Sequence, residues 1–207
     1  MKLLIIGANG KTGRALVQQA VERGHQVTAL VHHPPRLPLP SARILQGDAR
    51  DPALMDIAVA AQDAVIDTLG TRKPFLKTTL ETDAARNIIR AMHHHGVRRL
   101  IAVSSIGVGD SIANVKLLFR LLIPLFFRGA MPDKEGMEAE LRSSNLDWTI
   151  VRPAGLTDDP PTNDIHVISP QSRRHVFRIP RADVAAFILT QLEQGTLLQQ
   201  TVAIANR

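Results

Sequence analysis

The 207-residue sequence contains no cysteine and no tyrosine, and aromatic residues make up only 3% of it. Without cysteine the chain can form no disulfide, no thiolate nucleophile and no thiolate metal site. No apolar run approaches the roughly 18 residues that span a bilayer. The apolar run in MKLLIIGANG is also too short for the core of a signal peptide, which favours a cytoplasmic location.

The remaining composition is that of an ordinary globular protein. Hydrophobic residues make up 44% of the chain and charged residues 21%, a balance that excludes extended disorder. The length suits a single domain over 1–207, and no linker or repeat divides it. The net charge of +6 favours anionic partners, which include nucleotides, acidic small molecules and nucleic acid.

Short apolar segments alternate with helical patterns along the whole chain. Strands are expected at 2–6, 26–31, 43–46, 64–68, 99–104, 148–151 and 201–204. Helices are expected at 12–23, 52–61, 78–95, 115–127, 133–143 and 181–193. This alternation predicts an α/β fold, a Rossmann-like doubly wound parallel sheet covered by helices on both faces.

A glycine-rich turn, Gly7-Ala8-Asn9-Gly10-Lys11-Thr12-Gly13, joins the first strand to the first helix. In a dinucleotide-binding turn the first glycine allows the sharp bend, the second admits a pyrophosphate and the third allows close helix packing. The free N–H groups and dipole of the helix then face the phosphates. Lys11 and Thr12 can add a charge and a hydroxyl group. The alternative is a tight turn without a ligand.

The stretch Gly10-Lys11-Thr12 also resembles the end of a Walker A loop. That motif requires a glycine five positions before Gly10, where Ile5 lies inside the expected strand. The spacing therefore argues against an ATPase loop.

The segment LVHHPPR follows at 30–36, and the chain has no acidic residue between Glu22 and Asp48. An acid at the end of the second strand binds the ribose 2′-hydroxyl of NAD, whereas a basic residue accommodates the 2′-phosphate of NADP. His32 and Arg36 are the candidate phosphate ligands, and Arg36 offers a bidentate fork. The segment therefore predicts NADP(H), unless the loop is only a solvated basic surface. Asp48, after the third strand, is a candidate for the adenine amino group.

Several segments together resemble a known family. They are GANGKTG, VTALVHHPPRLP, GDA, QDAVIDTLGTR at 62–72, ARNIIRAMHHHGV at 85–97, LRSSNLDW at 141–148 and IPRADVAAFIL at 179–189. The chain is similar to the atypical, NmrA-like short-chain dehydrogenase/reductases, and within them to the branch of biliverdin-IXβ and NADPH-dependent flavin reductases. The resemblance covers nearly the whole chain.

The resemblance implies further cofactor contacts beyond the glycine turn, His32, Arg36 and Asp48. Ser104 and Ser105 match a pair beside the nicotinamide, and Ser105 is the candidate catalytic group that orients the nicotinamide or a water molecule. The alternative for Ser105 is a capping role at the strand end. The other implied contacts are Asn9, Ala49, Leu69, Gly70, Thr71, Arg72, Pro153, Ala154 and Gly155.

The resemblance also has departures. Gly107 stands where the branch has a pocket phenylalanine, Gly155 stands where it has a histidine, and 106–132 scarcely matches. Members that reduce ketones use a tyrosine and a lysine four residues later, a pair that this chain lacks. A flavin or an open-chain tetrapyrrole spreads the charge of an added hydride and takes its proton from solvent. These acceptors therefore need only proximity and orientation.

The sequence is compatible with two candidate functions. The first is an NADPH-dependent reductase for a flavin or a bilin such as biliverdin IXβ. The second is an NmrA-like NADP(H)-sensing regulator or assembly factor without turnover. A sugar epimerase fits poorly because it requires tyrosine.

Residues 115–128 carry a basic stripe of Lys116, Arg120 and Arg128 on an apolar helix. This helix could pack normally, cover the acceptor or contact a membrane surface peripherally. The branch leads us to expect a monomer.

The other basic and histidine-rich clusters of the sequence do not indicate a further ligand. His93-His94-His95 resembles a metal-binding tract, but consecutive helical residues point in different directions, so we expect no metal there. Arg98-Arg99 and Arg173-Arg174-His175 lack a recognition motif or interleaved aromatic residues. We therefore expect no nucleic-acid partner.

Overall fold

A computed structural model describes residues 1–34, 38–39, 41–71, 73–114, 127–168 and 178–206. Within these ranges the main feature is a mostly parallel sheet with the strand order β3-β2-β1-β4-β5-β6-β10-β8. Only β8 runs antiparallel to its neighbour. The strands are β1 (Lys2–Ile6), β2 (Gln26–Val31), β3 (Arg43–Gln46), β4 (Ala64–Asp67), β5 (Arg99–Val103), β6 (Asp147–Pro153), β8 (His166–Ile168) and β10 (Gln200–Ala205).

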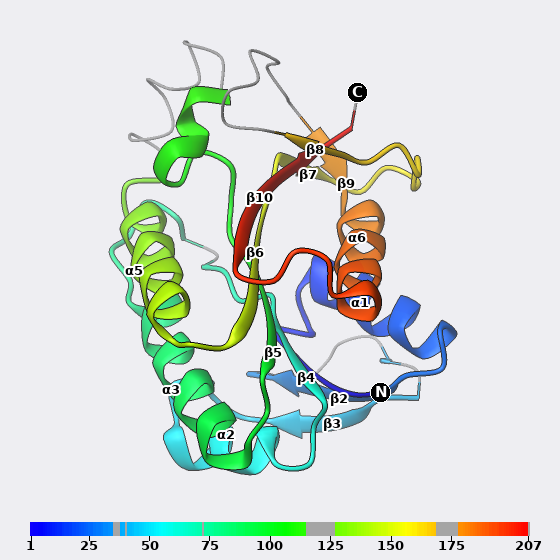
Figure 1. Cartoon of the computed structure of the whole chain (residues 1–207), viewed down its shortest axis with the longest axis vertical. Coiled ribbons are helices and arrows are strands. Elements are labelled where there is room, and N and C mark those ends of the chain that lie inside the picture. The colour runs from blue at the N-terminus through cyan, green and yellow to red at the C-terminus, as the bar shows by residue number, and fades with distance from the viewer. Residues whose placement is uncertain (35–37, 40, 72, 115–126, 169–177, 207) are drawn as a thin grey trace.

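Helices cover both faces of this sheet. They are α1 (Lys11–Glu22), α2 (Pro52–Val59), α3 (Leu80–His95), α5 (Ala130–Ser143) and α6 (Arg181–Gln194), with a short 3₁₀ helix η1 (Gly109–Asn114). Figure 1 shows α1 and α6 together on one face, and α2, α3 and α5 on the other. None of the described helices is long and apolar enough to cross a membrane.

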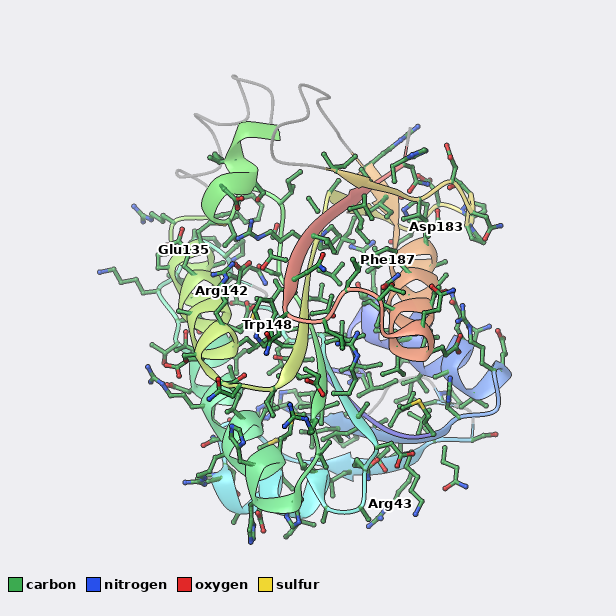
Figure 2. The ribbon with its side chains drawn as sticks, in the orientation of Figure 1. Arg43, Glu135, Arg142, Trp148, Asp183 and Phe187 are labelled. Carbon is green, nitrogen blue, oxygen red and sulfur yellow. The ribbon has the colours of Figure 1, made fainter. Side chains whose placement is uncertain are left out.

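Two apolar layers follow from this arrangement. Leu3 and Ile5 of β1 face α1 and α6, while Leu4 and Ile6 face the opposite helices, as the alternation of a strand requires. Phe187 of α6 belongs to the first layer and Trp148 of β6 to the second (Figure 2). Burial on both faces explains why the strands are continuous apolar runs.

The predicted fold class is confirmed, with small changes at the element ends. Strand β6 extends from Asp147 to Pro153 rather than over 148–151, and α5 begins at Ala130 rather than at 133. The sequence did not predict η1, β8 or the small sheet of β7 (Gly155–Thr157) and β9 (Arg178–Pro180). Most of the helix expected over 115–127 lies outside the described residues.

The strand order contains one reversal that matters for function. Strand β1 pairs with β2 on one side and with β4 on the other, so the chain first moves outward to β3 and then returns across β1. At such a reversal the loops leave the carboxyl ends of the two strands in opposite directions and open a crevice, where open α/β sheets bind their ligands.

Candidate dinucleotide-binding site

A cavity of about 360 Å³ lies at this reversal. Its lining comes from the segments that follow β1, β2, β3 and β4, together with the first residue of α3. The lining residues are Ile6, Gly7, Asn9, Gly10, Leu30, Val31, His32, His33, Gly47, Asp48, Ala49, Arg50, Thr68, Leu69, Gly70, Thr71 and Leu80. The structure thus places most of the residues that were predicted to contact the adenosine half of the cofactor around this one cavity.

The glycine turn has the geometry that the sequence predicted, with one difference. Gly7 has a φ of 75°, which L side chains rarely adopt, and the N–H of Gly10 bonds to the carbonyl of Gly7 at 2.9 Å. A Cβ on Gly13 would lie 2.4 Å from the Gly7 oxygen and 2.7 Å from the Ala8 Cα. Gly13 therefore lets α1 pack against the turn itself, rather than mainly against the sheet.

The turn leaves the start of α1 available to an anion. The first turn of the helix carries no acidic side chain, and the N-cap Gly10 has no side chain of its own to bond the free N–H groups. Lys11, which begins the helix, forms an ion pair with Asp158. Arg181 at the start of α6 donates to the other oxygen of Asp158 at 2.6 Å. Two cations therefore meet beside the turn around one carboxylate, while Thr12 is half-buried in the first turn.

Asn9 connects the turn to the end of β2. Its amide nitrogen donates to the carbonyl of His33 at 3.3 Å, and Nη2 of Arg14 donates to its Oδ1 at 2.9 Å. These bonds hold the turn beside the predicted 2′-phosphate segment. Arg14 was not among the predicted site residues, and its place one turn into α1 explains how it reaches back to Asn9.

The end of β2 presents histidines to the cavity. His32 and His33 are both exposed, with ring centroids 4.3 Å apart. Arg36 lies outside the described residues. Asp48 is the one acid on the described part of the lining, and it follows β3 rather than β2. The structure thus places no described carboxylate at the strand end where an NAD-selective protein would bind the ribose.

Asp48 is held by Arg50, a residue that the sequence reasoning missed. Nη2 of Arg50 lies 2.6 Å from Oδ2 of Asp48, and Nε lies 3.1 Å from Oδ1. This side-chain hydrogen bonding is the main reason that the pKa of Asp48 falls to about 2. The carboxylate therefore stays ionised as an acceptor, and a guanidinium adds a cation to the adenosine end. The sequence could have indicated this residue, since Arg50 directly follows the GDA segment at 47–49.

The segment after β4 forms the opposite wall. Leu69, Gly70 and Thr71, which were predicted as cofactor contacts, line the cavity together with Thr68, whereas Arg72 lies outside the described residues. Thr68 donates its hydroxyl to the carbonyl of Ile6 at 2.7 Å, which ties this wall to the end of β1. The N–H of Leu69 bonds to Asp67 at 2.9 Å, and burial raises the pKa of Asp67 to about 6.

The predicted nicotinamide residues lie at the neighbouring strand ends, outside the lining of this cavity. Ser105 follows β5 and donates its hydroxyl to the carbonyl of Ile106 at 3.1 Å. The N–H of Ile106 bonds to the carbonyl of Pro153, so the ends of β5 and β6 are joined. Ala154 is buried and Gly155 is exposed as β7 begins.

Ser104 does not offer its hydroxyl to a ligand, because it donates to Glu138 of α5 at 2.6 Å. Glu138 also accepts from the buried Arg152 of β6, and Nη1 of Arg152 reaches Asp110 of η1 at 2.5 Å. This buried network ties the end of β5 to η1 and α5. The sequence reasoning missed it, because polar residues of a helix normally face solvent.

The family model for NAD(P)H-binding proteins matches residues 7–195, a range that includes the whole cavity lining except Ile6. The chain belongs to this NAD(P)H-binding family. It is an atypical short-chain dehydrogenase/reductase with a Rossmann-like fold, which confirms the resemblance in the sequence.

Relatives of several kinds share this fold. An uncharacterised chloroplastic protein of Arabidopsis thaliana is 31% identical over 99% of this chain and 78% of its own length. The photosystem II assembly factor Ycf39 of Trieres chinensis is 28% identical, over 100% of this chain and 64% of its own length. The structure of ChuY, an anaerobilin reductase from Escherichia coli O157:H7, has a TM-score of 0.81 and 28% identity, covering 100% of this chain and 97% of that one.

Membership of the NAD(P)H-binding family matches the geometry of the cavity. The uncapped start of α1 suits the pyrophosphate, and Gly10, which has no side chain, lets the backbone approach it. The cavity beyond Gly10, between Asp48 and the wall at 68–71, suits the adenosine. The ends of β5 and β6, where the nicotinamide contacts are predicted, lie outside the lining of this cavity.

Proposed function

We propose that this protein is an NADPH-dependent reductase that transfers hydride to a planar conjugated acceptor, either a flavin or a bilin. The observation that carries the proposal is the composition of the adenosine end. His32, His33 and Arg50 line it, and its one described carboxylate, Asp48, is already bonded by Arg50. A site without a free carboxylate among its described residues suits the 2′-phosphate of NADPH better than the bare ribose of NADH.

The acceptor class rests on what the chain lacks and on one similarity. With no tyrosine, no phenol is available to protonate an alkoxide. A conjugated acceptor takes its proton from solvent, which removes the need for a positioned acid. ChuY, which is 28% identical over the full chain, is described as an anaerobilin reductase, and this supports a bilin or a related acceptor.

Bound NADPH supplies the hydride in this mechanism. The chain's own residues bind and orient: the glycine turn and α1 hold the pyrophosphate, and Asp48 accepts from the adenine amino group. Ser105 orients the nicotinamide amide or a water molecule with the hydroxyl that now bonds to Ile106. Ser104 acts only through position, because its hydroxyl is bonded to Glu138. Most of the rate enhancement then comes from proximity.

An exposed apolar surface in the segment after β4 supports a planar acceptor. Phe75 and Leu76 follow the lining residue Thr71, and both are exposed together with Phe127. The two segments lie side by side, since Nε of Arg128 donates to the carbonyl of Phe75 at 3.4 Å. These exposed phenylalanines are the aromatic residues that we propose to contact the acceptor, since Gly107 offers no side chain for this role.

A second candidate function is cofactor binding without turnover, as in an assembly factor or NADP(H)-sensing regulator. The similarity to Ycf39 over the whole of this chain favours it. In either case we expect a monomer that acts in the cytoplasm without a nucleic-acid partner. Contact between the 115–128 segment and a membrane surface remains part of this second proposal.

Anaerobic steady-state kinetics separate the two functions. The purified protein would receive NADPH with FMN, biliverdin IXβ or no acceptor, and NADH would serve as the cofactor control. Saturable acceptor reduction with NADPH preferred over NADH supports the reductase. Tight NADPH binding in a fluorescence titration, without turnover of any acceptor, would instead support the sensor.

A further inference from the structure

A cluster of potential metal ligands lies between α2 and α3, away from the cofactor cavity. Oδ1 of Asp56 in α2 lies 2.6 Å from Nδ1 of His94 and 3.1 Å from Nε2 of His95 in α3. One ligand atom from each of these side chains lies within 4.8 Å of the other two. The three donors therefore already converge on one small volume.

The convergence follows from the geometry of the two imidazole nitrogens. Consecutive residues on a helix point about 100° apart, so His94 and His95 approach one point from different directions. His94 uses its near nitrogen, Nδ1, and His95 uses its far nitrogen, Nε2. The expectation that no metal binds here rested on the helical positions of the histidines in α3 alone. Helix α2 packs against α3 (Figure 1), and Asp56 of α2 contacts both imidazole rings.

We propose that Asp56, His94 and His95 bind a divalent transition-metal ion, with Zn²⁺ as the best match. Two imidazoles and one carboxylate form a donor set that Zn²⁺ commonly uses, and water can complete a tetrahedral site. The last turn of a helix also favours a cation, because the helix dipole is negative there. His94 and His95 both lie in the last turn of α3.

The present distances allow this ion after a small adjustment. Zn–N and Zn–O bonds of about 2.0–2.1 Å in a tetrahedron separate neighbouring ligand atoms by roughly 3.3 Å. The contacts of Asp56 must therefore open by less than about 1 Å, and the two imidazole nitrogens, which lie within 4.8 Å of each other, must close by at most about 1.5 Å. The side chains of Asp56 and His94 are 43% and 68% exposed, so rotation about their own bonds can provide this opening without a change in the core.

The proposed metal site would affect the stability of the folded state rather than hydride transfer. Leu80 of α3 lines the cofactor cavity, and His94 lies on the same helix about 21 Å away at 1.5 Å per residue. A metal at Asp56, His94 and His95 would instead cross-link α2 to α3. Because such a bond exists only when both helices are folded and packed, its binding energy adds to the stability of the folded state. The inference therefore stands independently of the proposed reductase activity.

Calorimetric titration of the full chain with ZnCl₂, after removal of any affinity tag, tests this inference. We expect one equivalent of Zn²⁺ to bind to this cluster. Asp56→Asn and His94→Ala should each weaken it at least about tenfold, since even loss of a supporting residue around a metal costs that much. His93→Ala is the matched control, because His93 belongs to the same tract but lies outside the cluster, and it should bind as wild type.

Thermal unfolding gives a second readout that does not depend on enzyme activity. Zn²⁺ should raise the melting temperature of wild type and of His93→Ala, EDTA should reverse the rise, and Asp56→Asn should show none. Circular dichroism without metal would verify that each variant is folded. Zn²⁺ binding that is unchanged in both Asp56→Asn and His94→Ala, or lost equally in His93→Ala, would overturn the inference, as would no binding to wild type.

Discussion

The guanidinium of Arg152 and the carboxylate of Glu138 form a two-point hydrogen-bonded pair between β6 and α5. Nε lies 2.9 Å from Oε1 and Nη2 lies 2.7 Å from Oε2, with side-chain exposures of only 4% and 1%. Burial alone would raise the pKa of Glu138, but the hydrogen bonds from Arg152 and Ser104 hold it below its ordinary value. The pair is therefore charged, and each member depends on the other.

Replacing Arg152 by methionine should remove the buried charge partner of Glu138 and leave only the exposed Arg142 and the hydroxyl of Ser104 to compensate its carboxylate. We expect a loss of about 3–5 kcal/mol in the free energy of unfolding, measured by urea denaturation at pH 7. Arg142→Met is the matched control. Arg142 contacts the same carboxylate at 2.6 Å from an exposed position near the end of α5 (Figure 2), so its loss should cost less than about 1 kcal/mol. Equal losses in the two variants would contradict this account of the pair.

A second prediction concerns Glu81, which is buried at the start of α3 and bonded to Lys134 at 2.6 Å. Burial is the main cause that raises the pKa of Glu81 from 4.5 to about 7. Between these values the folded state binds more protons than the unfolded state, so stability falls as the pH rises. Asp67, with its pKa raised to about 6, contributes in the same direction over a lower range.

The Glu81→Gln variant has no carboxyl proton to release at position 81. Between pH 4.5 and pH 8 the stability of this variant relative to wild type should therefore improve by on the order of 3 kcal/mol, measured by urea denaturation at several pH values. Glu135→Gln, which changes an exposed carboxylate of α5, should follow the wild-type profile. Parallel profiles for wild type and Glu81→Gln would show that the Glu81 carboxyl does not titrate as its burial requires.

Cofactor selection is testable at the segment after β2. Arg36→Ala should raise the dissociation constant for NADPH about tenfold and leave that for NADH unchanged, because only NADPH carries the 2′-phosphate. Arg43→Ala is the control, since Arg43 is exposed at the amino end of β3, whereas the cavity lies at the carboxyl ends (Figure 2). Unchanged NADPH affinity relative to NADH in Arg36→Ala would disprove our interpretation of LVHHPPR.

Asp158 forms ion pairs with both Lys11 and Arg181, so we expect its carboxylate to compete with the cofactor pyrophosphate for these two cations. Asp158→Asn should release both cations and tighten NADPH binding by roughly threefold at low salt, with less gain at high salt. Asp164→Asn removes a charge from the same loop, where Asp164 is bonded to His166 instead, and should have no effect. Fluorescence titrations at two salt concentrations would decide, and weaker NADPH binding to Asp158→Asn would contradict the competition.

The sequence predicted those structural features that are determined by residues close together in the chain. The burial of β1, β4 and β5 on both faces appears as apolar runs, and Gly96, with a φ of 69°, ends α3 where expected. The glycine turn was predictable for the same reason, since its backbone geometry excludes most other residues. The three-residue strands β7, β8 and β9 were not, because strands of that length carry no periodicity.

The remaining features depend on partners that are distant in the chain. Asp133 and Glu138 lie on the buried face of α5, a position that the charge pattern alone assigns to solvent. Asp133 is buried because it accepts from the N–H groups of Glu81 and Thr82 at the start of α3. Asp56 likewise meets His94 and His95 only through helix packing. Such pairings are set by tertiary structure, which one sequence does not reveal.

The described cavity lining begins at Ile6 and ends at Leu80, before β5 is reached. A chain emerging from the ribosome with its N-terminus first therefore carries all of these lining residues while β5, β6, β10 and α6 have yet to be synthesised. The order of synthesis places the cavity-lining half first, and the later elements extend the sheet beside it and cover its apolar faces.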